Sequence, residues 1–538
     1  MFLRVLIGIT LVLPLAAQQS HVSGNRIRAH VKYLASDELQ GRGVGTVGER
    51  LATSYIAAQL KAEGVQPAGD SGTYFQRVPM IAVATLPGAS LLASGKGERI
   101  SFAPLKDFVG VPLSQKPDND FDAEAVFVGH GISAPEFGWD DYKGQNLRGK
   151  VLVYFTNEPS SSDPKFFGGP ALTYYGRWTY KFEEAARRSA AAAIIIHTTP
   201  TAGYGWGVVS GSWGREASQL KLKPGAIGLK LAAWISQDAG AKLMASTGKT
   251  LDQLLQLANQ KSFQPIPLGV RIQGHIPVKL REIESRNVVG RVAGSDPYLN
   301  SQAVVFSAHW DHLGVGVPVN GDKIYNGAVD NATGCGVVLD MARVWAALPR
   351  KPNRSAIFLF VTAEESGLLG SQYYGEHPEV PAGQTAVDIN YDALYPFGKT
   401  QDVSVTGAER TTLWPLVQHD AGQMNLTIEP DQEPGQGFYY RSDHFSFARV
   451  GIPAFSVEQG THYLGKPATF GKTIFEEYNA KHYHQPSDEY RDDWDFTGME
   501  QMADFGLRLG VDIANQPALP TWNKDDEFLA ARRKSGVD

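Results

Sequence analysis

The sequence predicts an α/β protein whose main domain has three layers, with helices on both faces of a mostly parallel sheet. Between about residues 287 and 515, strand and helix patterns alternate. The strands there are continuously apolar, as expected for strands buried on both faces. The chain has 538 residues, more than one hydrophobic core normally supports, so a second domain is expected.

Changes in composition divide the chain into segments. Residues 24–107 and 266–515 are predicted to form the main domain. Residues 108–265 combine short strands with a loop rich in Gly, Ser and Pro, and are predicted to be a smaller, β-rich inserted domain. The polar residues 516–538 are predicted to be a loosely held tail.

Each element has a local signal. A short helix is expected over 26–35, before a Gly-rich break, and Thr46 and Glu49 are typical of a capping box that starts a second helix. In the inserted segment we expect strands at 125–128, 150–155 and 194–196 and a helix over 181–193. In the main domain we expect strands at 303–308, 356–362, 386–390 and 454–457 and helices at 334–347 and 499–513.

The first 17 residues are typical of a signal peptide. Arg4 precedes an apolar run from Val5 to Leu15, and the small residues Ala16 and Ala17 follow. A membrane anchor is the alternative, but the run is short for a span. We therefore expect an exported protein, periplasmic or secreted from a bacterium, without a membrane span in the mature chain.

Charge and cysteine content narrow the class of protein. The net charge is −6 and there is no basic stretch, so nucleic-acid binding is not expected. Cys335 is the one cysteine, so an intramolecular disulfide is impossible. We expect it to be a small buried side chain rather than a catalytic thiol.

Several residues of the types that bind zinc follow predicted strands or lie in turns. In an open parallel sheet, ligands bind beyond the carboxyl ends of the strands. One metal ion rarely takes five protein ligands, whereas two ions that share a bridging carboxylate do. The sequence therefore predicts a two-metal site of the kind that hydrolases use, formed by His309, Asp330, Glu365, Asp392 and His484, with Glu364 left over as a base.

Five segments resemble the ordered motifs of the di-zinc aminopeptidase family. They are SAHWDH at 307–312, GAVDNATG at 327–334, TAEESGLLGS at 362–371, NYD at 390–392 and YHQPSD at 483–488. This family includes secreted bacterial leucyl-type aminopeptidases and glutamate carboxypeptidase-like enzymes. The inserted segment resembles the protease-associated domain of many members, which implies a lid that shapes the cleft.

The resemblance assigns a role to each candidate. It implies two Zn²⁺ ions, one held by His309 and Asp392, the other by Glu365 and His484, with Asp330 bridging both. Glu364 would be the general base. Asp311 would accept a hydrogen bond from the His309 ring and so orient it. The family also carries a cis peptide after the bridging Asp, so we expect a cis bond between Asp330 and Asn331.

Two further residues are substrate-binding candidates. Arg441 lies in an Arg-Ser-Asp-His segment like that of the secreted aminopeptidases, where the Arg holds substrate oxygen; a structural salt bridge with Asp443 is the alternative. Tyr483 could donate to the oxyanion or could simply pack. His312, His444 and His462 are not assigned to a metal.

The expected function is removal of N-terminal residues from peptide substrates by a metal-dependent aminopeptidase. A carboxypeptidase or dipeptidase on the same scaffold is one alternative. A receptor-like relative that has lost its metals is another, which the presence of all the ligands and Glu364 disfavours.

Overall fold

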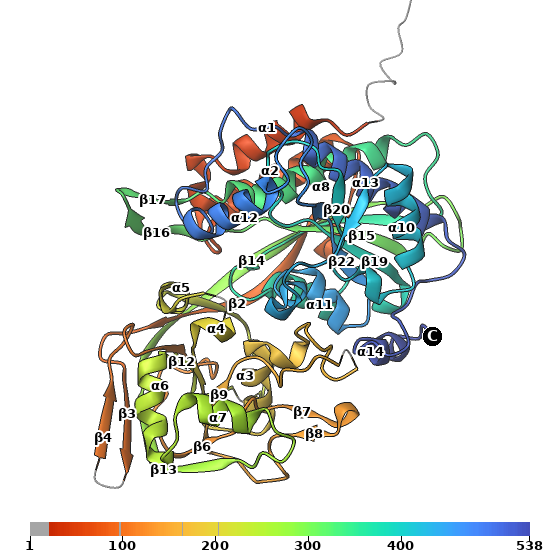
Figure 1. The fold of residues 1–538 in the computed structure, drawn as a ribbon. Coiled ribbons are helices and arrows are strands. Elements are labelled where there is room, and N and C mark those ends of the chain that lie inside the picture. Colours follow the sequence, from red (N-terminus) through yellow and green to blue (C-terminus); the bar gives the residue numbers. More distant parts are fainter. Residues whose placement is uncertain (1–20, 96–97, 164, 203, 227) are drawn as a thin grey trace, which may run out of the picture.

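Two large β-sheets form the centres of the molecule, joined by the long strands β2 and β14 (Figure 1). The computed structural model describes residues 21–538 except 96–97, 164, 203 and 227. The predicted signal segment, residues 1–17, lies outside the described residues.

The first sheet carries the strands predicted for the main domain. Its order is β11 (Ala217–Leu220), β2 (Phe75–Thr85), β14 (Val278–Val292), β18 (Ser355–Val361), β15 (Ala303–His309), β19 (Thr385–Asn390) and β22 (Ala454–Ser456), with β1 (Gln66–Pro67) paired to β14. Strands β18, β15, β19 and β22 are parallel, whereas β11, β2 and β14 continue the sheet in antiparallel pairs. The parallel half is the part that the apolar strand pattern predicts.

Helices cover both faces of this sheet, as the fold class requires. One layer consists of α1 (Gly24–Leu34), α2 (Val47–Ala62), α8 (Thr333–Ala347) and α13 (Thr497–Asn515), with α10 (Trp414–Gln423) beside α13. The other layer contains α9 (Leu369–Glu376) and α11 (His444–Arg449).

The side chains of the central strands explain this layering. In β15, Val304 and Phe306 pack into the core beneath α8 and α13, whereas Val305 packs into the core beneath α9 and α11. In β18, Phe358 and Leu359 divide between the two cores in the same way. Because every second residue points to the opposite face, a strand covered on both sides must be apolar throughout.

The second sheet contains the strands of the predicted inserted segment, and it also takes in strands on either side of that segment. Its order is β4 (Glu98–Phe102), β3 (Ser90–Gly95), β13 (Ile266–His275), β6 (Phe121–Phe127), β9 (Val151–Phe155), β10 (Ala192–Ile196), β12 (Leu231–Ile235) and β5 (Phe108–Val111). The sheet therefore runs from residue 90 to residue 275 and extends beyond residues 108–265 on both sides. Around it lie α3 (Trp178–Arg187), α4 (Thr199–Ala202), α5 (Trp206–Trp213), α6 (Gln237–Met244) and α7 (Leu251–Ala258).

Two expectations about helix ends are wrong. Helix α3 ends at Arg187 rather than at residue 193, because Ser189 takes a left-handed conformation (φ 55°) and residues 192–193 already pair in β10. No capping box forms at Thr46: its side chain caps no helical N–H, while Glu49 accepts from the Gly45 N–H and the Ser285 hydroxyl.

The C-terminal segment is not loosely held. Trp522 is 1% exposed, and its indole N–H donates to the main-chain oxygen of Gly451. Arg532, in α14 (Leu529–Lys534), is fully buried and donates to the main-chain oxygens of Pro520 and Ala382. The polar composition of residues 516–538 gave no indication of these contacts.

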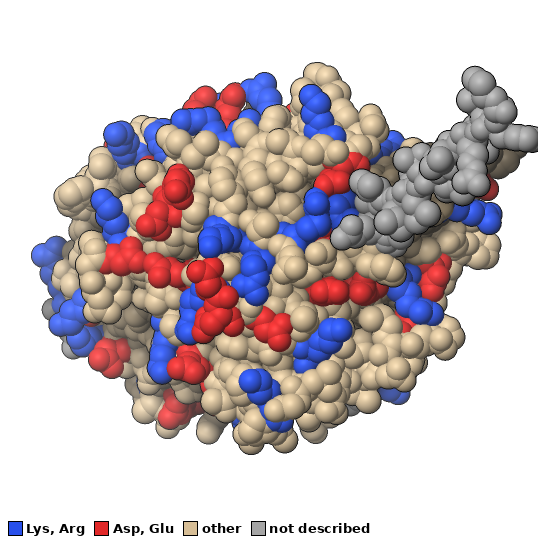
Figure 2. All heavy atoms as spheres, turned by 90° about the horizontal axis from the view of Figure 1, so that it is seen from above, with Lys and Arg blue, Asp and Glu red and all other residues tan. Residues whose placement is uncertain are grey.

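The surface seen from above mixes both signs of charge, with Lys and Arg interspersed among Asp and Glu (Figure 2). Among the helices of the described residues, none is both long and apolar enough to cross a membrane.

Candidate metal centre

The six residues predicted to form the metal site come together at the carboxyl ends of the parallel strands. His309 is the last residue of β15, and Glu364 and Glu365 follow β18 within four residues. Asp392 follows β19 by two residues. Asp330 lies in the turn that opens α8, and His484 lies in the turn after α12 (Phe470–Lys481).

The two carboxylate oxygens of Asp330 face two different histidines. Its Oδ1 lies 3.2 Å from Nε2 of His309, which is also 3.1 Å from Oδ1 of Asp392. Its Oδ2 lies 3.4 Å from Nε2 of His484, which is 3.0 Å from Oε2 of Glu365. The geometry therefore divides the residues into two groups that share one carboxylate.

These separations suit zinc ligands. With metal–ligand bonds of roughly 2.1 Å, ligand atoms around a tetrahedral ion lie about 3.4 Å apart. The side chain of Asp392 is 19% exposed and that of His484 is 27% exposed, so solvent reaches both groups. Nitrogen and oxygen donors in this proportion fit zinc, and an open side leaves room for water or substrate.

Negative charge dominates the cluster. Burial by itself lowers the pKa of His484, but Glu365 and Asp330 raise that pKa to about 10. Burial also lowers the pKa of His309. The charges of Asp392 and Glu364 outweigh this effect and raise the pKa well above its usual value. Carboxylates that attract protons this strongly to neighbouring imidazoles also attract metal cations.

The turn that carries Asp330 is held from two sides. The bond between Asp330 and Asn331 is cis, as predicted. The carboxylate of Asp488 accepts hydrogen bonds from the N–H groups of Val329 (3.0 Å) and Asp330 (3.1 Å). Buried Arg42 donates to the main-chain oxygen of Gly327, at 2.8 Å, from the other side.

Arg42 and Asp488 are therefore structural supports of the site that the sequence did not single out. Arg42 also donates to the main-chain oxygens of Trp310, Asn326 and Leu34. The available signals were the position of Asp488 at the end of the YHQPSD segment and that of Arg42 inside a Gly-rich break.

Asp311 contacts His309 mainly through its backbone. The Nδ1 atom of His309 lies 3.2 Å from the main-chain oxygen of Asp311 and 3.8 Å from its carboxylate. That carboxylate accepts instead from the N–H of Glu364, at 3.1 Å. Asp311 thus positions the residue proposed as the base as well as the imidazole.

His312 was set aside by the sequence analysis, but it lies in the second group. Its buried Nδ1 is 2.5 Å from Oε1 of Glu365, the oxygen that does not face His484. The rings of His312 and His484 meet edge to face at 5.7 Å. Its place three residues after His309, on the strand end that forms the site, was the available signal.

The two substrate-binding candidates differ in their surroundings. The ring of Tyr483 stacks on His484, with centroids 3.8 Å apart, and the side chain is 44% exposed. Arg441 forms no ion pair with Asp443 within the part of the chain that the structure describes; it donates to the main-chain oxygen of Gln436 and lies over the ring of Phe438. Its neighbour Ser442 donates to Oδ2 of Asp392, at 2.6 Å.

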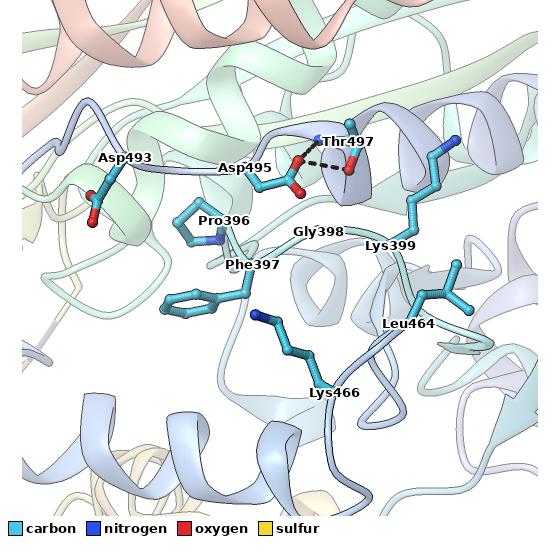
Figure 3. Close-up of a pocket in the computed structure, with 9 residues that line it drawn as sticks. All are labelled: Pro396, Phe397, Gly398, Lys399, Leu464, Lys466, Asp493, Asp495 and Thr497. Atoms are coloured by element: carbon cyan, nitrogen blue, oxygen red, sulfur yellow. Dashed lines mark hydrogen bonds between the residues drawn. The ribbon is translucent and has the colours of Figure 1, made fainter.

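A second group of potential metal-binding side chains lies elsewhere in the main domain, beside the small sheet of β20 (Asp402–Ser404), β21 (Thr427–Glu429) and β23 (Glu458–Gln459). It comprises Asp402, Glu429 and His462. Nearby is a surface pocket of about 390 Å³, lined by Phe397, Lys399, Leu464 and Asp495 among others (Figure 3). None of the residues predicted for the zinc site lines this pocket.

Comparison with known proteins agrees with the motifs. Residues 287–508 match the sequence profile of peptidase family M28. A 177-residue region is 25% identical to leupeptin-inactivating enzyme 1 of Streptomyces exfoliatus and covers 33% of this chain and 36% of that protein. A 109-residue region, 20% of this chain, is 33% identical to a probable leucine aminopeptidase 2 of Aspergillus oryzae.

These sequence matches are partial. They span 18% of the length of the Aspergillus protein and 8% of a Saccharomyces cerevisiae vacuolar membrane protease, which is 34% identical over 94 residues, or 18% of this chain. The solved structure of an aminopeptidase from Aneurinibacillus sp. strain AM-1 superposes over 92% of this chain and 93% of its own, with a TM-score of 0.51 and 19% identity. That likeness establishes a shared fold.

Proposed function

Since residues 287–508 of this chain belong to peptidase family M28, we propose that the protein is a zinc-dependent aminopeptidase that hydrolyses the N-terminal peptide bond of peptides. The observation that carries the proposal is the division of the ligand cluster at Asp330. Its two oxygens face separate histidines, which is the arrangement that two metal ions sharing one carboxylate need.

The residues present fit two zinc ions. His309, Asp392 and Asp330 would hold one ion, and His484, Glu365 and Asp330 the other. Bound zinc supplies Lewis acidity, which lowers the pKa of water and polarises a carbonyl. The chain fixes the ligand positions through three strand ends of one sheet and two turns.

We assign the transfer of the proton to Glu364. It neighbours Glu365 in sequence, and its side chain makes no hydrogen bond to any residue that the structure describes, so its carboxylate is free to act on water. In the proposed reaction Glu364 takes a proton from the attacking water and delivers it to the leaving amine. Tyr483, exposed beside His484, is positioned to donate a hydrogen bond to the oxygen of the tetrahedral intermediate.

Two features of the wider chain belong to this proposal. The region around the second sheet, which includes residues 108–265, acts as a protease-associated lid over the site. The N-terminal segment directs export of the protein to the periplasm or the medium.

The test is a panel of aminoacyl-anilides and N-blocked peptides, assayed with and without a chelator. The proposal predicts cleavage of anilides with a free α-amine, loss of that activity on chelation and its return with zinc. Release of C-terminal residues from N-blocked peptides would instead establish a carboxypeptidase.

A further inference from the structure

The second domain contains a pocket of about 380 Å³ at the carboxyl ends of two neighbouring parallel strands, β10 and β12. His197 directly follows β10 and Ser236 directly follows β12, and both line the pocket. The first residues of α4, α5 and α6 line it as well (Figure 1). Open α/β sheets bind ligands outside the carboxyl ends of their strands, and the volume is that of a small-molecule site. None of the proposed zinc ligands lines this pocket.

Hydrogen bonds tie the walls of the pocket together. The N–H of His197 donates to the main-chain oxygen of the last residue of β12, at 2.9 Å. The N–H of Ser236 donates to the main-chain oxygen of Asp107, also at 2.9 Å. The indole N–H of Trp206 donates to the main-chain oxygen of Leu105, at 2.9 Å. The pocket is therefore formed before a ligand arrives, which lowers the entropic cost of binding.

His197 brings an unpaired ring nitrogen to the pocket. The residue is 2% exposed, and its Nε2 lies 3.1 Å from the main-chain oxygen of Tyr204. A carbonyl oxygen only accepts, so Nε2 carries the proton. Burial lowers the pKa of His197, so the ring is neutral at neutral pH. Its Nδ1 makes no hydrogen bond to any residue that the structure describes and is free to accept one from a ligand.

The start of α6 supplies main-chain donors on another wall. The side chain of Ser236 caps this helix by accepting from the N–H of Ala239. Gln237 and Asp238 are the first two residues of the helix, so their N–H groups have no acceptor within it. Both residues line the pocket. Free N–H groups at a helix start, together with the helix dipole, favour a carboxylate.

Four charged side chains line the pocket, and their charges cancel. Lys106 and Lys242 are positive, and Asp107 and Asp238 are negative. None of the four forms an ion pair with another residue in the described part of the chain. The carboxylate of Asp107 accepts one hydrogen bond, from the N–H of Ala103. A lining with equal numbers of both charges disfavours a simple anion or cation and suits a ligand that carries one charge of each sign.

We propose that this pocket binds a free α-amino acid with an apolar side chain, as its zwitterion. The carboxylate binds at the start of α6 with Lys106 and Lys242. The ammonium group donates to Nδ1 of His197 and is attracted by the two aspartates. The side chain packs on the ring of Trp206, which meets the His197 ring edge to face at 5.7 Å. This binding site lies apart from the proposed peptidase function and does not depend on it.

Calorimetric titration with L-phenylalanine tests the site. The zinc-loaded protein and its Asp330→Ala variant should bind the amino acid at the pocket with equal affinity, because the variant disrupts only the metal centre. Phenylalaninamide lacks the carboxylate and N-acetylphenylalanine lacks the ammonium group. Each should bind Asp330→Ala at least tenfold more weakly than phenylalanine, equivalent to about 1.4 kcal/mol. The amide resembles the N-terminus of a peptide and the acetylated compound its C-terminus, so equal binding of either would overturn the inference.

Substitutions in the lining locate the binding. Replacing Lys106 and Lys242 together by Gln should weaken binding of phenylalanine at least tenfold. Lys249→Gln is the matched control, because Lys249 is an exposed lysine of the same domain that does not line the pocket, and its affinity should equal that of the wild type. His197→Phe removes the acceptor for the ammonium group. It should reduce the preference for phenylalanine over N-acetylphenylalanine to less than about threefold. Thermal melting shows whether each variant is folded.

The outcomes separate this inference from the proposed function. No saturable binding at millimolar concentrations of phenylalanine, or unchanged affinity in the double lysine variant, would overturn the inference. Loss of binding in Asp330→Ala would also overturn it, because the ligand would then lie at the metal centre. If the protein cleaves no peptide but binds phenylalanine as described, the proposed function fails and the pocket site stands. If it cleaves peptides but binds phenylalanine only at the metal centre, the pocket site alone is refuted.

Discussion

The main domain contains two clusters of histidine and carboxylate side chains, one around Asp330 and one formed by Asp402, Glu429 and His462, and their geometry differs. In the group around Asp330, Nε2 of His309 and Nε2 of His484 each lie 3.0–3.4 Å from oxygens of two different carboxylates, and the imidazole of His309 is 1% exposed. Nδ1 of His312 lies closer, at 2.5 Å from Oε1 of Glu365. In the other group, Nδ1 of His462 lies 2.6 Å from Oδ2 of Asp402, which is a hydrogen-bond distance, and the imidazole is 54% exposed.

In the group of Asp402, Glu429 and His462, the carboxylates also have protein hydrogen-bond donors and so need no metal. The oxygens of Asp402 accept from the N–H groups of Thr461 and His462, and Glu429 accepts from the N–H and hydroxyl of Thr461. Residue types alone do not separate a metal centre from a hydrogen-bonded cluster. Burial and the supply of protein hydrogen-bond donors do.

The largest expected effect comes from Asp330→Ala. Because both ligand groups depend on this one carboxylate, the variant should lose most of its zinc, and anilide hydrolysis should fall at least a thousandfold (order of magnitude). Elemental analysis and kinetics measure both quantities. His462→Ala is the control, and its zinc content should match that of the wild type. Loss of zinc from His462→Ala as well would show that the group of Asp402, Glu429 and His462 also binds metal.

Glu364→Gln should separate metal binding from catalysis. The amide cannot accept the proton of the attacking water, so kcat should fall by about 10²–10⁴-fold while zinc content stays unchanged. Activity close to that of the wild type would refute the role of Glu364 as the base.

His312→Leu tests how His312 supports the ligand group formed by Asp330, Glu365 and His484. His312 contacts the Glu365 oxygen that does not face His484, so its loss should weaken binding of the zinc held by Glu365 and His484 about 10–100-fold. His312→Asn retains an N–H donor and should recover part of the affinity. Zinc titrations in a metal buffer give the dissociation constants, and equal values for all three proteins would contradict this role.

The smallest expected effect concerns the group of Asp402, Glu429 and His462. The hydrogen bond to Asp402 raises the pKa of His462 above its usual value. The pair therefore stabilises the fold below about pH 6.5, the unfolded value, and this contribution is lost as pH rises through the folded pKa.

His462→Gln should thus lower the free energy of unfolding by up to about 1 kcal/mol at pH 5.5 and by less at pH 8.5, since the pair is exposed. Urea unfolding at the two pH values measures the difference. An equal loss at both would show that His462 acts through packing rather than charge.

The strand ends explain why the sequence could predict that these residues come together. His309, Glu365 and Asp392 each follow a strand whose apolar run is visible in the sequence, and parallel strands bring such ends together. His312 was missed because its contact with Glu365 joins two strand ends in a way that spacing does not reveal. Arg42 was missed because its acceptors lie up to 285 residues away in the sequence.

Contacts between residues far apart in the sequence also limit how much of the fold could be predicted. The apolar pattern predicts the parallel half of the first sheet, but the limits of the second sheet depend on which strands β3 and β4 pair with. The burial of Trp522 depends on a contact with Gly451, 71 residues earlier, and the polar residues around it gave no sign of it.

Anomalous X-ray diffraction at the zinc absorption edge, from crystals of the purified protein, locates any zinc ions that Asp330 bridges. We predict two peaks, one beside His309 and Asp392 and one beside His484 and Glu365, with Asp330 between them and no peak at His462. A single peak, or a peak between His462 and Asp402, would contradict this prediction.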